Sequence, residues 1–204
     1  MGVKKLSPKE FGRIRREQIL CTIDKLGFVS TSQLRKLHNL GSERNSQKVI
    51  QRMSQYLHCQ RLQENVFYLN KKGRELIGST KVRTRMENIE HAVMRNEIYI
   101  QFDKPEIWEP EFKITENETG KTILVSDVRF KAGDAHYLVE VDHRQHMINN
   151  RRKIDKYKEI KKMNNGFLPM LIWLTKVDSR QKTLEEYMEQ KGIEGYVMTL
   201  NDVY

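Results

Sequence analysis

Residues 122–142 read TILVSDVRFKAGDAHYLVEVD and decide the fold of the C-terminal part of the chain. Apolar residues dominate 122–130 and 136–141, so the sequence predicts a strand in each segment. Lys131 to Ala135 form a short connection that contains Gly133, which is typical of the turn that closes a hairpin. We therefore expect two antiparallel strands here.

Three carboxylates lie on this predicted hairpin. Folding it brings Asp127 close to Glu140, and Asp142 shares a face with Glu140 because the two residues are two positions apart on one strand. Carboxylate oxygens that converge from adjacent strands suit a hard divalent cation such as Mg²⁺. Acidic residues that end strands without binding any metal are the alternative.

The rest of the C-terminal region alternates predicted helices and strands. The all-apolar segment Met170–Leu174 suggests a strand that is buried on both faces, hence a mixed sheet covered by helices. The fold class expected for this region is therefore α/β or α+β. The other predicted elements are helices at 86–102, 149–163 and 179–191 and strands at 108–114 and 196–200.

Charge is distributed unevenly along the chain. Residues 1–85 carry 19 Lys and Arg against 6 Asp and Glu, whereas residues 86–204 carry 18 against 21. A basic block of this kind usually marks a surface that binds nucleic acid, with a membrane surface or mere solubility as alternatives.

The pattern within the basic half favours nucleic acid. Apolar residues recur at helical spacing from Pro8 to Leu26, a second short helix begins after Ser30, and Ser42 can cap a third. Two strands, 57–60 and 66–69, follow. The third helix directs polar side chains outward, and Arg, Asn and Gln can read base edges while Lys meets phosphates. The residues we expect to bind DNA are Arg44, Asn45, Gln47, Lys48, Gln51, Arg52 and, between the strands, Arg61.

The predicted order of elements resembles a winged helix-turn-helix domain, which has two helices, a recognition helix and a two-stranded wing. The resemblance covers residues 8–78, and it implies binding to double-stranded DNA. A three-helix module that binds proteins through a solvated basic face is the alternative. The expected organisation is a DNA-binding domain at 1–78, a basic linker at 79–85 and a second domain at 86–204.

The second domain resembles the core of the PD-(D/E)XK nuclease superfamily, with Asp127 and Glu140 on consecutive strands. The resemblance implies that these two residues bind Mg²⁺, that the Val141 carbonyl assists, and that a helix glutamate, Glu90 or Glu87, completes the site. The chain departs from the pattern because Asp142 stands where the superfamily places a lysine. The next helix offers Lys153 and Lys156 as substitutes.

A narrower resemblance covers nearly the whole chain. Residues 137–142, YLVEVD, followed by a basic helix that contains Lys153 to Tyr157, are similar to the replication-relaxation family of plasmids, phages and integrative elements. It implies association with the DNA of mobile elements, and its marked positions here are Glu140, Asp142, Lys156 and Tyr157. A structural role is open for each of them: Tyr157 can pack the helix on the sheet, Lys156 can be a solvated charge, and Asp142 can cap a turn.

Other classes of function are disfavoured. No apolar run approaches a membrane span, residues 1–9 lack the apolar core of a secretion signal, and we expect a cytoplasmic protein. Residues 192–195 lack the downstream Lys-Ser or Lys-Thr of a nucleotide-binding loop, which disfavours a nucleotide-driven motor or helicase. No cofactor is expected, apart from Mg²⁺ if the second domain is a nuclease. His143 and His146 have no recognised metal-ligand spacing and are expected in a loop, and Cys21 is expected in the core.

The sequence thus favours a DNA-binding protein of a mobile element, with a nuclease-like domain that does not cut. It would act in replication, DNA relaxation or transcriptional control, and the second domain could form a homodimer. The alternative is a Mg²⁺-dependent endonuclease or nickase that uses Asp127 and Glu140, with Asp142 and Lys156 as further catalytic residues.

Overall fold

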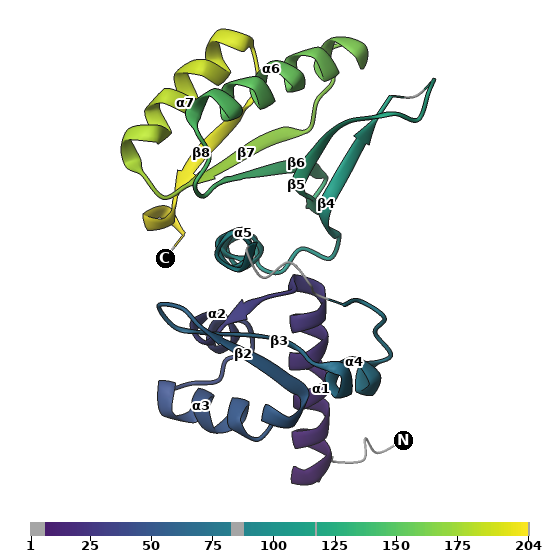
Figure 1. The fold of residues 1–204 in the computed structure, drawn as a ribbon, viewed down its shortest axis with the longest axis vertical. Helices are drawn as coiled ribbons and strands as arrows, with labels where there is room; N and C mark the ends of the chain where they lie inside the picture. The colour runs from purple at the N-terminus through teal and green to yellow at the C-terminus, as the bar shows by residue number, and fades with distance from the viewer. Residues whose placement is uncertain (1–6, 83–87, 117, 204) are drawn as a thin grey trace. The chain divides into compact units, whose positions relative to one another are not determined.

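A computed structural model describes residues 7–82, 88–116 and 118–203 of the chain. It divides into two compact units, Met1–Asn96 and Glu97–Tyr204. The first is mainly helical with a small sheet, and the second is built on a larger mixed sheet (Figure 1). The expected mixed class, with a helical N-terminal part and a C-terminal mixed sheet, is confirmed.

The first unit contains the three helices and the hairpin that the sequence predicts, together with one short helix, α4, that it did not. Its elements are α1 (Pro8–Leu26), β1 (Val29–Ser30), α2 (Thr31–Leu37), α3 (Glu43–Gln51), the 3-10 turn η1 (Ser54–Tyr56), β2 (Leu57–Arg61), β3 (Asn65–Leu69) and α4 (Lys71–Ile77).

Helix ends in this unit are set by local chemistry. Ser7 caps α1 in a reciprocal pair with Glu10, and Gly27 ends that helix with φ 90°, a conformation that a residue with a Cβ rarely adopts. Ser30 pairs with Gln33 in the same way at the start of α2, and the Ser42 hydroxyl accepts a hydrogen bond from the Asn45 amide to start α3. The predicted helix starts at Ser30 and Ser42 are therefore confirmed.

The small sheet has the order β1-β3-β2, with both pairs antiparallel. Cys59 lies opposite Phe67 and Arg61 opposite Asn65, so residues 57, 59 and 61 share a face with 65, 67 and 69. The interior of the unit is formed by fully buried side chains from α1 and α2 with one from the turn before α3, namely Ile19, Leu20, Ile23, Leu26, Leu34 and Leu40.

The helix α5 (Ile89–Gln101) contributes residues to both units. Ile89 and Ala92 pack with Phe28 and Val66 in the first unit. Tyr99, in the second, packs edge-on against Trp108 with ring centroids 5.0 Å apart.

The remaining elements of the second unit follow the predicted order. They are β4 (Trp108–Thr115), β5 (Thr122–Ala132), β6 (Ala135–Asp142), α6 (Met147–Met163), β7 (Met170–Thr175), α7 (Asp178–Lys191), β8 (Gly195–Thr199) and the 3-10 turn η3 (Leu200–Asp202). The sheet order is β4-β5-β6-β7-β8, antiparallel from β4 to β6 and parallel from β6 to β8. The predicted hairpin is confirmed, since Ala132 pairs with Ala135 across Gly133, whose φ is 58°.

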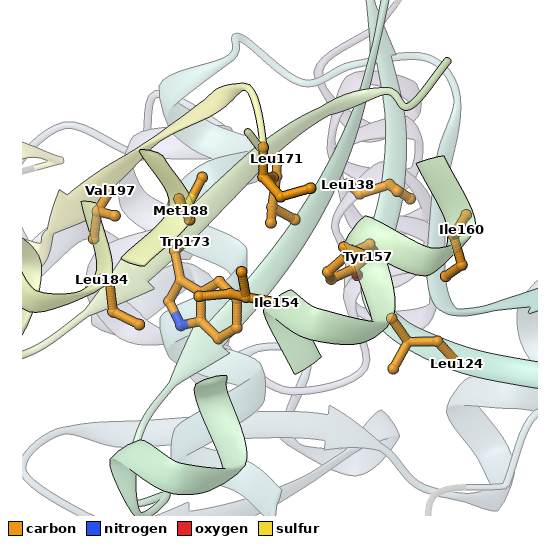
Figure 2. Packing of buried hydrophobic residues seen from close by; sticks show 11 residues of the cluster. Leu124, Leu138, Ile154, Tyr157, Ile160, Leu171, Trp173, Leu184, Met188 and Val197 are labelled. Carbon is orange, nitrogen blue, oxygen red and sulfur yellow. The ribbon is translucent and has the colours of Figure 1, made fainter. Parts of the chain in front are cut away.

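One face of this sheet is covered by α6 and α7, which lie side by side (Figure 1). Ile154 and Tyr157 on α6 point toward Trp173 and Leu171 of β7, and Leu184 of α7 packs into the same cluster (Figure 2). Trp173 and Tyr157 are almost completely buried, so this interface supplies most of the apolar burial that holds the helices on the sheet.

Three smaller expectations have mixed outcomes. Residues 79–82 of the expected linker are described, and Ser79 donates a hydrogen bond to Asp24 of α1 at 2.5 Å, whereas residues 83–85 lie outside the described part of the chain. The expectation that Cys21 is a core residue was wrong, because its side chain lies on the exposed side of α1. Among the helices of the described ranges, none has both the length and the apolar content of a membrane span.

Gly73 in α4 allows a close backbone approach that can be tested. A Cβ atom at this position would lie 2.3 Å from the carbonyl oxygen of Tyr56, whereas a Cβ at Gly12 in α1 would meet nothing within 4 Å. We expect Gly73→Ala to lower the free energy of unfolding by about 1–3 kcal/mol through overpacking. Gly12→Ala, the matched control, should raise it by about 0.5–1 kcal/mol. Urea denaturation measures both, and a Gly73→Ala protein as stable as the Gly12→Ala protein would contradict the packing described.

Candidate functional site

The exposed side of α3 carries the side chains that the sequence predicts for DNA. Ser46 and Ile50 face inward and are buried, which leaves the opposite side of the helix in solvent. All the predicted DNA-binding residues are exposed, namely Arg44, Asn45, Gln47, Lys48, Gln51 and Arg52 on or next to α3 and Arg61 at the end of β2.

Not all of these residues are equally available. The Asn45 amide donates to the Leu40 carbonyl oxygen at 2.7 Å, so it holds the turn before α3, and the Gln47 amide donates to Glu43 at 3.3 Å. In the described part of the chain, by contrast, Arg44, Lys48 and Arg52 have no acidic side chain within ion-pair distance. These three cations are therefore the ones most available to an external polyanion.

A groove of about 590 Å³ separates α3 from the β2–β3 hairpin. Its lining includes Ile50, Leu57 and Phe67, which are all largely buried, and the exposed side chains of Arg35 and Arg61. Sequence reasoning missed Arg35, because its position in α2 shows its relation to the hairpin only after folding.

The hairpin is tied to the start of α2. The two carboxylate oxygens of Glu64 accept hydrogen bonds from the backbone amide and the hydroxyl of Ser32, at 2.8 and 2.7 Å. The Thr31 hydroxyl donates to the Asn65 carbonyl oxygen at 3.2 Å. These bonds fix the turn of the hairpin beside α2 and so preserve the groove.

In the second unit, Asp127 lies where β5 and β6 separate. Regular pairing of the two strands ends at Val128 and Val139, and the Val141 amide donates instead to the Asp127 carboxylate at 2.7 Å. Glu111 on β4, between the paired positions on either side of Asp127, has φ 55°. Asp127 thus replaces a missing backbone partner at an irregular point of the sheet.

Glu140 is buried beneath α6, with 1% of its surface exposed. The Tyr157 hydroxyl donates to one carboxylate oxygen at 2.5 Å, and the Lys153 ammonium donates to the other. Burial, reinforced by the nearby negative charge of Asp127, raises the pKa of Glu140 to about 8, against the opposing effect of Lys153 and Tyr157. Burial also raises the pKa of Tyr157, which keeps its hydroxyl protonated as a donor.

The basic partner of Glu140 is therefore Lys153. Lys156, the lysine that the family resemblance marks, is exposed. Ile154 and Tyr157 occupy the inward face of α6, so Lys156 projects to its outer side. The structure brings Asp127, Glu140, Lys153 and Tyr157 together and leaves Lys156 out.

Asp142 forms a second enclosed cluster on the same side of the sheet. Its two oxygens accept from the Arg180 guanidinium of α7 at 2.5 and 3.0 Å, and the Thr175 hydroxyl donates to it at 3.4 Å. Glu140 and Asp142 thus face the helix-covered side together, as predicted. No sequence signal identified Arg180, because it is far from Asp142 along the chain. The two residues meet only after β6 pairs with β7, the strand that precedes α7.

These carboxylates do not fit a Mg²⁺ site. Both oxygens of Glu140 and both oxygens of Asp142 accept hydrogen bonds from side chains of the same unit. Over the described ranges, no three His, Cys, Asp or Glu side chains converge as metal ligands. Glu90 belongs to the first unit and Glu87 lies outside the described residues, while His143 and His146 are in the loop before α6, as expected.

The elevated pKa of Glu140 predicts how stability depends on pH. The folded protein holds this proton up to about pH 8, whereas the unfolded chain releases it near pH 4.5. The contribution of Glu140 to stability is therefore greatest below about pH 4.5 and is lost as pH rises through 8. We expect the free energy of unfolding of the Glu140→Gln protein to fall less between pH 5 and 9 than that of the wild type. Urea denaturation at several pH values measures this difference. Glu159→Gln, which changes an exposed carboxylate of α6, is the control, and equal pH slopes for wild type and Glu140→Gln would contradict the assignment.

Among the comparisons with known proteins, one identifies a family. No curated protein matches the chain. A crystal structure of protein VC1899 from Vibrio cholerae is similar over 91% of this chain, with 10% identity and a TM-score of 0.39, and this chain spans about half of that protein, 47% of its length. The replication-relaxation family matches residues 20–171, which is most of the sequence. The chain therefore belongs to the replication-relaxation family.

Proposed function

We propose that the protein binds double-stranded DNA through its first unit and acts in the replication of a mobile element. Family membership supports a role in replication. The order α1, α2, α3 and β2–β3 hairpin supports a winged helix-turn-helix arrangement, in which α3 enters the major groove and the hairpin lies beside it.

The observation that carries this proposal is the set of unpaired cations on the exposed side of α3. Arg44, Lys48 and Arg52 have no acidic partner among the described residues, although acidic side chains neutralise other cations of the same unit, such as Arg13 and Lys81. Arg61 adds a further cation on the hairpin across the groove. Phosphates would neutralise these cations, and arginine and glutamine can also pair with base edges.

The second unit is proposed to be nuclease-like in fold and without catalytic activity. The succession of α5, three strands, α6, β7, α7 and β8 supports the resemblance to the PD-(D/E)XK core. Catalysis in that superfamily needs carboxylates that face substrate, whereas Glu140 is enclosed by Tyr157 and Lys153. We also propose a role in DNA relaxation or in transcriptional control. In addition, we propose that the second unit self-associates.

Charge reversal on α3 tests DNA binding directly. We expect Arg44→Glu with Lys48→Glu to weaken binding to a mixed-sequence duplex by at least tenfold and to reduce the dependence of affinity on salt, because about two phosphate contacts are lost. Fluorescence anisotropy at several salt concentrations measures both. Lys71→Glu with Lys72→Glu, on the exposed side of α4, changes the net charge equally. Equal effects of the two double variants would refute the assignment of α3.

A cleavage assay tests the endonuclease alternative. We expect no cutting of supercoiled or linear DNA by the purified protein in Mg²⁺ or Mn²⁺, because the oxygens that would bind the metal are already engaged. Asp127→Ala and Glu140→Ala are assayed beside it. Cutting that disappears in both variants would overturn the non-catalytic proposal, whereas cutting that persists in both would identify a contaminant.

A further inference from the structure

The helix α6 is basic in an otherwise acidic unit. Its residues Met147–Met163 contain seven Lys and Arg and two Asp and Glu. The rest of Glu97–Tyr204 contains 10 Lys and Arg against 17 Asp and Glu. Helix α6, which covers one face of the sheet, thus carries a net positive charge, whereas the rest of the unit carries a net negative charge (Figure 1).

The cations of α6 fall into two groups. Those that lie close to the body of the unit have acidic partners there, since Lys153 pairs with Glu140 and Lys161 with Glu194 at 3.3 Å. We call the second group the α6 basic face. Its exposed members are Arg152, Lys156 and Lys162, and beside them lie Arg151, which stacks on the Tyr187 ring of α7 at 5.3 Å, and the half-exposed Lys158.

Three cations of the α6 basic face have no ion-pair partner in the described part of the chain. No acidic side chain of the described residues lies within ion-pair distance of Arg152, Lys156 or Lys162. The nearest acid along the helix, Asp155, is bonded to Lys191 of α7 at 2.7 Å and to the Tyr187 hydroxyl. Only Glu159 adds an exposed negative charge to this side of the helix.

The spacing of these cations is unfavourable for an isolated helix. Arg152 and Lys156 are four residues apart, as are Lys158 and Lys162, so each pair places like charges on neighbouring turns. Along the helix axis, Arg152 and Lys162 are separated by about 15 Å. Bound phosphates would relieve the repulsion within each pair, because nucleic acid presents closely spaced negative charges.

We propose that the α6 basic face is a second DNA-binding surface, which holds the phosphate backbone without reading its sequence. This surface presents positively charged side chains. It has few side-chain amides that could read base edges. This inference goes beyond the proposed function, because it assigns a DNA contact to the second unit, apart from α3. An anionic membrane would be the competing partner, since Ile148 and Met163 are exposed near the two ends of α6. Double-stranded DNA is favoured because the cations between those ends leave no continuous apolar stripe for insertion.

The test is a salt titration of DNA binding by the full chain. We expect Arg152→Gln with Lys156→Gln to lower affinity for a mixed-sequence duplex roughly tenfold at low salt, and to reduce the slope of log affinity against log salt by about 1.8, from two lost phosphate contacts. Lys158→Gln with Lys162→Gln should act in the same direction. The matched control is Lys121→Gln with Lys182→Gln, which removes two exposed cations elsewhere in the same unit.

The outcomes separate this inference from the function proposed for α3. A smaller slope of log affinity against log salt in the α6 variants, with an unchanged slope in the control, supports the inference about α6. This holds even if the Arg44 and Lys48 variant binds DNA normally. An unchanged slope, or an equal loss in the control, overturns it and leaves the α3 proposal untouched. Binding to anionic vesicles that exceeds binding to DNA, and that is lost in the α6 variants, would also overturn it in favour of a membrane partner.

Discussion

The burial of the Glu140 carboxyl beneath α6 is the constraint on which the second unit depends. A polar carboxyl group removed from water is costly unless hydrogen-bond partners surround it. Here Tyr157 and Lys153 supply those donors from one face of the helix, while Asp127 replaces a backbone partner where the strands separate. The polar cluster therefore fixes the position of α6 on the sheet, and the apolar contacts around Trp173 complete the interface.

The same constraint separates the cations of α6 by role. Lys153 donates a hydrogen bond to the buried Glu140 and so belongs to the structure, whereas no acidic side chain of the described residues lies within ion-pair distance of Arg152 or Lys156. An enclosed carboxylate is poorly placed for metal-dependent hydrolysis, and an outward row of cations is well placed to hold phosphates. Together with the cations of α3, this arrangement supports the proposal that the protein binds DNA without cutting it.

Most of the fold could be predicted from the sequence because its signals are local. The caps at Ser30 and Ser42 and the turn at Gly133 act within a few residues, and the predicted elements appear at nearly the predicted bounds. The candidate site was less predictable, because its partners meet only in three dimensions. Arg180 reaches Asp142 across the β6–β7 pair, and the choice of Lys153 over Lys156 depends on which side of α6 packs inward. The exposure of Cys21 likewise depends on packing that its helical pattern did not reveal.

Alkylation of the two free cysteines in the presence of duplex DNA tests most directly whether DNA lies against α3 and the hairpin. Cys59 lines the groove between these elements, whereas Cys21 is exposed on α1 outside the groove lining, so each molecule carries its own control. Saturating DNA is expected to slow the reaction of a neutral maleimide with Cys59 severalfold and to leave Cys21 unchanged, with Cys21→Ser and Cys59→Ser proteins used to assign the rates. Equal rates at Cys59 with and without bound DNA would contradict the placement of DNA at this groove.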